Sequence, residues 1–201
     1  MPYKNIFEER EHALENEYFH KKEQELIAKM REKVAREEER HQMAETIGVA
    51  DQEVLEALQE LGYTTATVRL LYLVPLVQIA WAEGGVSEEE RTQILEFAAA
   101  RGITPDTAAY DQLLEWLKQE PPQEFYDNTL RAVRYVIEAL PEQQRTESRQ
   151  SLVEYCTQIA EISGGILGFG KISDEERLLI ARIATEIGQT RSDAVKRVIE
   201  G

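Results

Sequence analysis

The segment 70–102 constrains the fold of this chain most, because it predicts two packed helices joined by a tight turn. From residue 70 to residue 82, only Pro75 and Gln78 are not plainly apolar or aromatic. A helix that is apolar on nearly every face belongs in a core rather than on a surface. The pair Gly84-Gly85 follows, and glycine readily adopts the left-handed conformation that ends a helix. Pro75 either kinks this buried helix or breaks it into two short ones.

A second helix is predicted directly after this turn. Ser87 and Glu90 form the pattern S-x-x-E, a capping box in which each side chain bonds the free backbone N–H of the other. Apolar residues follow at helical spacing, and Gly102 is expected to end the helix.

The same pattern returns near the C-terminus, where KISDEER at 171–177 matches GVSEEER at 85–91. The capping box recurs as Ser173 with Glu176, after a glycine-rich loop at 163–170. We interpret the two stretches as pseudo-repeated helix–loop–helix hairpins of one design.

These motifs resemble the TerB-like (tellurite-resistance) domain family. That family carries a hydrophobic helix ending in Ala-Asp-Gly, a short linker with Val-Ser, and a helix opening with Glu-Glu-Arg. The corresponding stretch here is 82–91, with an echo at 170–177, and the resemblance runs from about Val68 to the end. Glu83 replaces the usual aspartate, and the second copy has no Asp-Gly. The resemblance implies an all-helical domain of stress-response type, with Glu83 and Glu90 at the positions that match a metal role.

Charge limits the partners that this chain can have. Its 201 residues carry a net charge of −15 with a pI of about 4.7, and 42% of them are hydrophobic, enough for a sizeable core. Nucleic-acid phosphates need clustered Lys and Arg, so we expect no nucleic-acid partner. Anionic membrane surfaces are disfavoured for the same reason. An acidic surface suits cations, basic partners or simple solubility.

The compartment is expected to be the cytoplasm. The single cysteine, Cys156, lies on the apolar side of a predicted helix, which favours a core position over a catalytic thiol. The first 19 residues are charged and show no leader pattern, and the longest apolar run is too short to cross a bilayer, so we expect no transmembrane segment.

Residues 1–46 predict a long charged helical segment, formed by one helix or by two joined ones, that precedes a domain at 47–201. From residue 5 onward the segment contains neither Gly nor Pro, and as a whole it carries 9 Lys/Arg and 12 Asp/Glu. Its apolar positions are sparse and approximate two stripes, one of Phe19, Leu26, Met30 and Val34 and one of Phe7, Leu14 and Tyr18. Such thin stripes cannot form a hydrophobic core by themselves. We therefore expect this helical segment to dock on the body, bind a protein partner or self-associate.

Part of this segment, 7–32, faintly resembles the start of the zeta-type inhibitor subunit of bacterial ATP synthases. The likeness rests on Phe7, Arg10-Glu11, Glu15, Tyr18-Phe19 and Glu23. It implies an inhibitor or regulator of a partner enzyme such as an ATPase. The simpler interpretation is a charged amphipathic helix.

The remaining patterns are helical, and no stretch alternates convincingly, so we expect an all-α helical bundle without a sheet. Helix starts are predicted at Asp51, at Thr104-Pro105-Asp106 and after Pro121-Pro122. Further helices are predicted at 142–162, 174–187 and 192–200.

The acidic turns of the two hairpins are the candidate chemical site. If the hairpins pack by a pseudo-twofold, their carboxylates converge, and oxygen ligands suit a hard divalent cation such as Ca²⁺ or Mg²⁺. The candidate ligands are Glu83, Glu89, Glu90, Asp174 and Glu176, with Glu88 and Glu175 beside them. The alternative is that these acids only cap helices and favour the positive helix ends.

The sequence shows no catalytic constellation, so a non-enzymatic binding or scaffold module is the expected function. The alternatives are a regulator acting through the N-terminal helix and a metal-dependent enzyme that uses the acidic turns.

Overall fold

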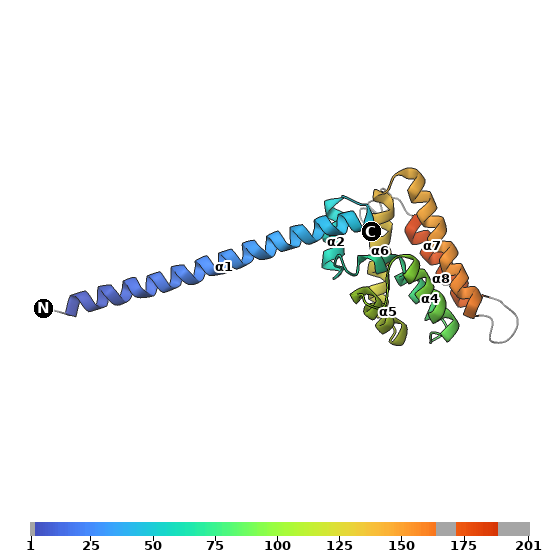
Figure 1. Ribbon diagram of the computed structural model, residues 1–201, viewed down its shortest axis with the longest axis horizontal. Helices are drawn as coiled ribbons and strands as arrows, with labels where there is room; N and C mark the ends of the chain where they lie inside the picture. The colour runs from blue at the N-terminus through green and yellow to red at the C-terminus, as the bar shows by residue number, and fades with distance from the viewer. Residues whose placement is uncertain (1–2, 164–171, 189–201) are drawn as a thin grey trace, which may run out of the picture. The chain divides into compact units, whose positions relative to one another are not determined.

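The computed structural model describes residues 3–163 and 172–188, with side chains from Glu17 onward. The predicted loop at 163–170, apart from its first residue, and the predicted helix at 192–200 lie outside these ranges. The elements are α1 (Tyr3–Ile47), α2 (Gln52–Glu60), a 3₁₀ turn η1 (Val68–Tyr72), α3 (Val74–Ala80), α4 (Glu88–Ala100), α5 (Ala108–Lys118), α6 (Gln123–Ala139), α7 (Glu142–Ser163) and α8 (Asp174–Gly188) (Figure 1). The described residues contain no strand, so the expected all-α fold is confirmed.

The chain divides into two units between His41 and Gln42. The first consists of most of α1, a continuous helix of 45 residues and about 68 Å. Neither Gly nor Pro interrupts it, and the long helix predicted for this segment is confirmed. The last turns of α1 belong to the second unit, where Met43 is fully buried and Ala44 and Ile47 pack against the core.

The second unit is organised around α3, in which every residue is buried. Helices α4, α6, α7 and α8 all pack against it. A helix surrounded by other helices must be apolar on all sides, which explains why this short segment has almost no polar residues.

The buried segment around Pro75 is broken into two short helices rather than kinked. Residues 70–82 do not form one helix, because η1 ends at Tyr72 and α3 begins at Val74. Pro75 then lies in the first turn of α3, where a missing N–H breaks no helical hydrogen bond.

The helix start predicted at Thr104-Pro105-Asp106 is displaced. Helix α5 begins at Ala108, and Thr107 is its N-cap. The Thr107 hydroxyl donates to the carbonyl oxygen of Thr104 at 2.7 Å and accepts from the backbone N–H of Tyr110 at 3.2 Å. Because this side chain closes a turn over 104–107, the helix starts one turn later than the proline suggests.

The two predicted hairpins are present, α3 with α4 and α7 with α8. Helix α7 contacts both α4 and α8. The ring of Tyr155 on α7 packs on Phe97 of α4 at 4.6 Å between centroids, with the Arg101 guanidinium 5.0 Å from the Tyr155 ring centre. At the other end of the second hairpin, Arg149 Nε donates to the carbonyl oxygen of Ile187 at 2.9 Å. The contacts of Tyr155 with Phe97 and Arg101 therefore join the two hairpins, and the Arg149 hydrogen bond holds the two helices of the second hairpin together.

Candidate functional site

The acidic turn of the first hairpin forms the capping box that its sequence predicts. The Glu90 carboxylate accepts hydrogen bonds from the backbone N–H and the hydroxyl of Ser87, both at 2.8 Å to the same oxygen. The backbone N–H of Glu90 donates to the Ser87 hydroxyl oxygen at 3.2 Å. Gly84, with φ +85°, provides the left-handed turn that precedes the box.

The second hairpin repeats this geometry nearly atom for atom. The Glu176 carboxylate accepts from the Ser173 backbone N–H at 2.8 Å and from its hydroxyl at 3.0 Å. The Glu176 N–H donates to Ser173 Oγ at 3.2 Å. The repeated motif therefore builds two equivalent carboxylate positions at the starts of α4 and α8.

Both capping glutamates are buried, with 2% of Glu90 and none of Glu176 exposed. Burial raises the pKa of the Glu90 carboxyl, and the Ser87 hydrogen bonds partly offset this by favouring the charged form. The charges of Glu176 and Glu83 raise the pKa of Glu90 further. The charges of Glu83, from the first hairpin, and of Glu176, from the second, thus both act on Glu90.

The other candidate ligands, Glu89 and Asp174, lie exposed in the first turns of α4 and α8, as do Glu88 and Glu175. Negative charge there interacts favourably with the positive helix ends. Glu83 follows the buried helix and is itself exposed, so water solvates the charge that the helix end disfavours. Within the described ranges, no three His, Cys, Asp or Glu side chains are grouped so as to hold a metal ion. The metal site therefore stays a prediction, while the hydrogen bonds of both capping boxes are observed.

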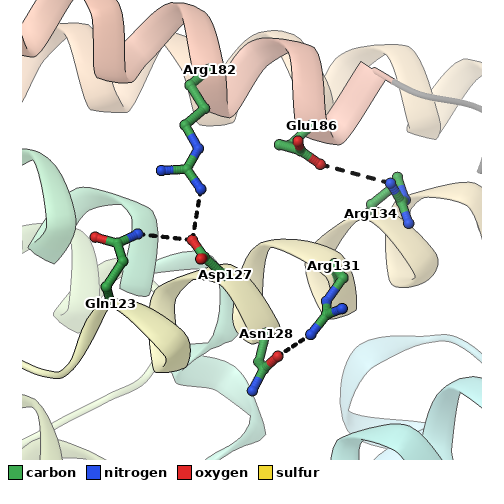
Figure 2. A network of polar contacts seen from close by, with 7 residues as sticks. All are labelled: Gln123, Asp127, Asn128, Arg131, Arg134, Arg182 and Glu186. Atoms are coloured by element: carbon green, nitrogen blue, oxygen red, sulfur yellow. Dashed lines mark hydrogen bonds and ion pairs between the residues drawn. The ribbon is translucent and has the colours of Figure 1, made fainter. Parts of the chain in front are cut away.

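A second polar cluster, between α6 and α8, was not anticipated from the sequence. Asp127 on α6 accepts from Arg182 Nη2 on α8 and from Gln123 Nε2, both at 2.8 Å (Figure 2). Arg131 donates to the side-chain oxygen of Asn128 on the same helix. A groove of about 410 Å³ runs along this cluster, and its lining residues are Glu124, Asp127, Asn128, Leu130, Arg131, Arg182 and Glu186.

Figure 2 also shows an ion pair between Arg134 on α6 and Glu186 on α8. The guanidinium nitrogen lies 3.8 Å from the carboxylate oxygen. Only 6% of the Arg134 side chain is exposed, against 33% for Glu186. The guanidinium also lies 5.1 Å from the ring centre of Tyr135. A buried arginine needs such partners, because an uncompensated charge in a core is costly.

The burial of Arg134 could have been predicted from its position in the sequence. It lies four residues after Leu130 and three before Ile137, within the apolar stripe of α6. A charged residue at a core-facing position implies a buried partner, although the partner on α8 cannot be named from spacing alone.

Helix α1 carries the third feature, an exposed apolar stripe. Its members, at helical spacing, are 58–65% exposed, and they are Phe19, Leu26, Met30 and Val34. Cys156, by contrast, is fully buried, as its place on α7 predicted.

Comparisons of this chain with protein-family models, with curated proteins and with solved structures gave no match. Among the helices of the described residues, none has both the length and the apolar character needed to cross a membrane.

Proposed function

We propose that this chain is a cytoplasmic, non-enzymatic binding module of TerB-like type, in which the helical body is a scaffold and α1 contacts a protein partner. One observation carries the proposal: the stripe of Phe19, Leu26, Met30 and Val34 is exposed on α1. The stress-response assignment rests on the resemblance of the hairpin motifs alone.

A single exposed apolar side chain is common on protein surfaces and needs no explanation. Four of them on one face of a helix form a continuous apolar surface, which does need one. Spacings of seven and four residues place them in one line along the helix, the arrangement through which helices pair. The negative charge of the chain supports a protein partner over a nucleic acid.

The test uses the full chain as bait and compares it with the double variant Leu26→Asp/Met30→Asp. The matched control is Gln24→Asp/Ala28→Asp, which adds the same charges on the opposite face of α1. We expect partner proteins recovered by the wild type and the control to be lost with the stripe variant. Recovery of the same proteins by all three chains, or of none by any, would contradict a role for the stripe.

A second candidate function is divalent-cation binding at the acidic turns. The supporting observation is that the charges of Glu83 and Glu176 both act on the buried Glu90. Ca²⁺ or Mg²⁺ would relieve this repulsion, and carboxylate oxygens are the ligands that both ions prefer. The capping oxygen of Glu90 already accepts two hydrogen bonds, so its second oxygen would have to turn toward the ion.

Thermal unfolding of the wild type and of Glu83→Gln, each with Ca²⁺, Mg²⁺ or chelator, tests cation binding. Glu115→Gln on α5 controls for the loss of one exposed charge. If Glu83 is a ligand, the metal-dependent rise in Tm shrinks in Glu83→Gln, because a ligand stabilises only the state it binds. A wild-type Tm indifferent to all three additions would remove the cation hypothesis.

The regulator alternative uses the same helix, with an enzyme such as an ATPase as the partner. Its support is the faint zeta-type likeness over 7–32, and the identity of a stripe-dependent partner distinguishes it from a scaffold role. A metal-dependent enzyme would need the cation site first, so the unfolding experiment tests its premise.

A further inference from the structure

A row of three lysines runs along one edge of the apolar stripe of α1. Lys22, Lys29 and Lys33 are separated by seven and four residues, so they share one line on the helix. At about 100° per residue, this line lies roughly 60° around the helix from the apolar stripe. The surface therefore has an apolar centre and a basic edge, which we call the lysine-edged stripe.

This part of the helix is basic within an acidic chain. Residues 18–36 contain six Lys/Arg and three Glu, whereas the whole chain carries −15. Local contacts hold the lysines only weakly: the Lys22 ammonium is 5.8 Å from the Tyr18 ring centre, and Lys33 lies 3.9 Å from Glu37. Both members of the Lys33–Glu37 pair are more than half exposed, and such pairs contribute little stability. The positive edge thus remains available to carboxylates of another molecule.

An antiparallel second copy of α1 fits this surface poorly. Antiparallel pairing that lays one stripe on the other sets Phe19 opposite Val34, with Leu26 near the centre. In that arrangement the same edges of the two helices face each other, so the lysine rows meet. Like charges across an interface disfavour the pair.

A lipid surface fits poorly as well. Glu23 and Glu37 lie on the same line as Phe19 and Leu26, so an inserted stripe would carry two carboxylates toward the acyl chains. A partner helix can instead place polar groups opposite those positions.

We infer that residues 19–36 of α1 bind an acidic amphipathic α-helix of another protein. Its apolar residues pack on Phe19, Leu26, Met30 and Val34, and its flanking carboxylates pair with Lys22, Lys29 and Lys33. Oppositely charged flanks select the partner and its orientation in paired helices. This inference rests on the proposed function and adds the chemistry of the partner.

The experiment measures binding of two synthetic helical peptides to the full chain by fluorescence anisotropy. Both peptides carry the same leucine stripe, flanked in one by glutamates and in the other by lysines. We expect the glutamate peptide to bind the wild type at least tenfold more tightly. In Lys29→Glu/Lys33→Glu the preference should reverse, while the control Lys21→Glu/Arg31→Glu, with both changes away from the lysine row, should keep the wild-type preference. Circular dichroism checks that every variant retains its helix content.

Equal affinity for the two peptides, or equal effects of the two double variants, would overturn the inference. So would a dimer of the wild type in sedimentation equilibrium that depends on Leu26, or co-sedimentation of the wild type with phosphatidylserine vesicles. If partner capture still depends on Leu26 and Met30 while neither peptide is preferred, the proposed function stands and only the acidic-partner inference fails. If partner capture does not depend on Leu26 and Met30 and neither peptide is preferred, both the proposed function and the acidic-partner inference fail.

Discussion

Glu90 and Glu176 occupy equivalent positions in two hairpins, each accepting the backbone N–H and the hydroxyl of the serine three residues before it. Although 86 residues separate them in sequence, the charge of Glu176 acts on Glu90 and raises its pKa. The repeat therefore has an electrostatic consequence, because two buried carboxylates of like charge lie within range of each other.

The first prediction concerns the pH dependence of stability. Because the pKa of Glu90 is raised on folding, mainly by burial, the folded state holds this proton more tightly than the unfolded state. The contribution of Glu90 to stability is therefore lost as the pH rises from the unfolded pKa, near 4.5, through the folded value. Glu90→Gln removes this dependence while a glutamine can still cap Ser87. We expect the free energy of unfolding of Glu90→Gln, relative to wild type, to increase between pH 4 and pH 7.

Chemical denaturation at several pH values measures this difference. Glu115→Gln serves as the control for removing one carboxylate from the molecule. A relative stability of Glu90→Gln that falls with pH would mean that the hydrogen bonds of the capping box outweigh burial and repulsion.

Local signals allowed much of this fold to be predicted from sequence. Asp51 caps α2, Ser87 caps α4, and Gly102 takes a positive φ of 74°, all as expected, since caps and stops depend on residues a few positions apart. A local signal gives the wrong start where a second one competes with it: the helix expected to begin at Thr104-Pro105-Asp106 begins at Ala108 instead, because Thr107 closes a turn before it. Contacts between residues on different helices cannot be predicted from local spacing. The spacing along α6 places Arg134 toward the core, but it does not identify Glu186 on α8 as its partner.

In the candidate site, too, local contacts could be predicted from the sequence and contacts between hairpins could not. The hydrogen bonds of each capping box follow from S-x-x-E, but the interaction between the two boxes depends on how the hairpins pack. Convergence of Glu83, Glu90 and Glu176 was a hypothesis that required a pseudo-twofold arrangement. The effects of the Glu83 and Glu176 charges on Glu90 are consistent with it.

A second prediction compares the two ion pairs between α6 and α8. In Asp127–Arg182 both side chains are more than 40% exposed, so Asp127→Asn should lower stability by no more than about 1 kcal/mol. Glu186→Gln should cost roughly 1–3 kcal/mol, because it leaves the buried Arg134 charge without its carboxylate. Urea denaturation of the two variants gives the comparison, and an Asp127→Asn cost equal to or above that of Glu186→Gln would contradict this burial argument.

A third prediction contrasts two buried tyrosines. The Tyr63 hydroxyl is hydrogen-bonded to the Thr129 hydroxyl at 3.1 Å, whereas the Tyr126 hydroxyl has no partner among the described residues. Tyr63→Phe should therefore cost about 1 kcal/mol, and Tyr126→Phe should be neutral or stabilising. Thermal unfolding of the two single variants measures this, and a larger loss for Tyr126→Phe would reveal a partner for that hydroxyl.

A fourth prediction concerns the single cysteine. Complete burial raises the pKa of the Cys156 thiol to about 12, so almost no thiolate is present at neutral pH. We expect a thiol reagent at pH 8 to label the native protein only as fast as it opens, and to label it rapidly in concentrated guanidinium chloride. Fast native labelling would show that α7 leaves the core readily.

The last prediction separates α1 as a binding helix from α1 as part of the core. Met43 is fully buried with the hydrophobic core of the second unit, while the stripe residues of the first unit are more than half exposed. Deleting residues 1–36 should therefore leave the stability of the body nearly unchanged and abolish binding through the stripe. Deleting residues 1–46, the segment that composition alone sets apart, also removes Met43, and should cost about 2–5 kcal/mol, as the loss of a buried large side chain does. Met43→Ala in the full chain should reproduce most of that cost without affecting the stripe. Guanidinium unfolding of the three chains decides the matter, since equal stability of both truncations would place the end of α1 outside the core.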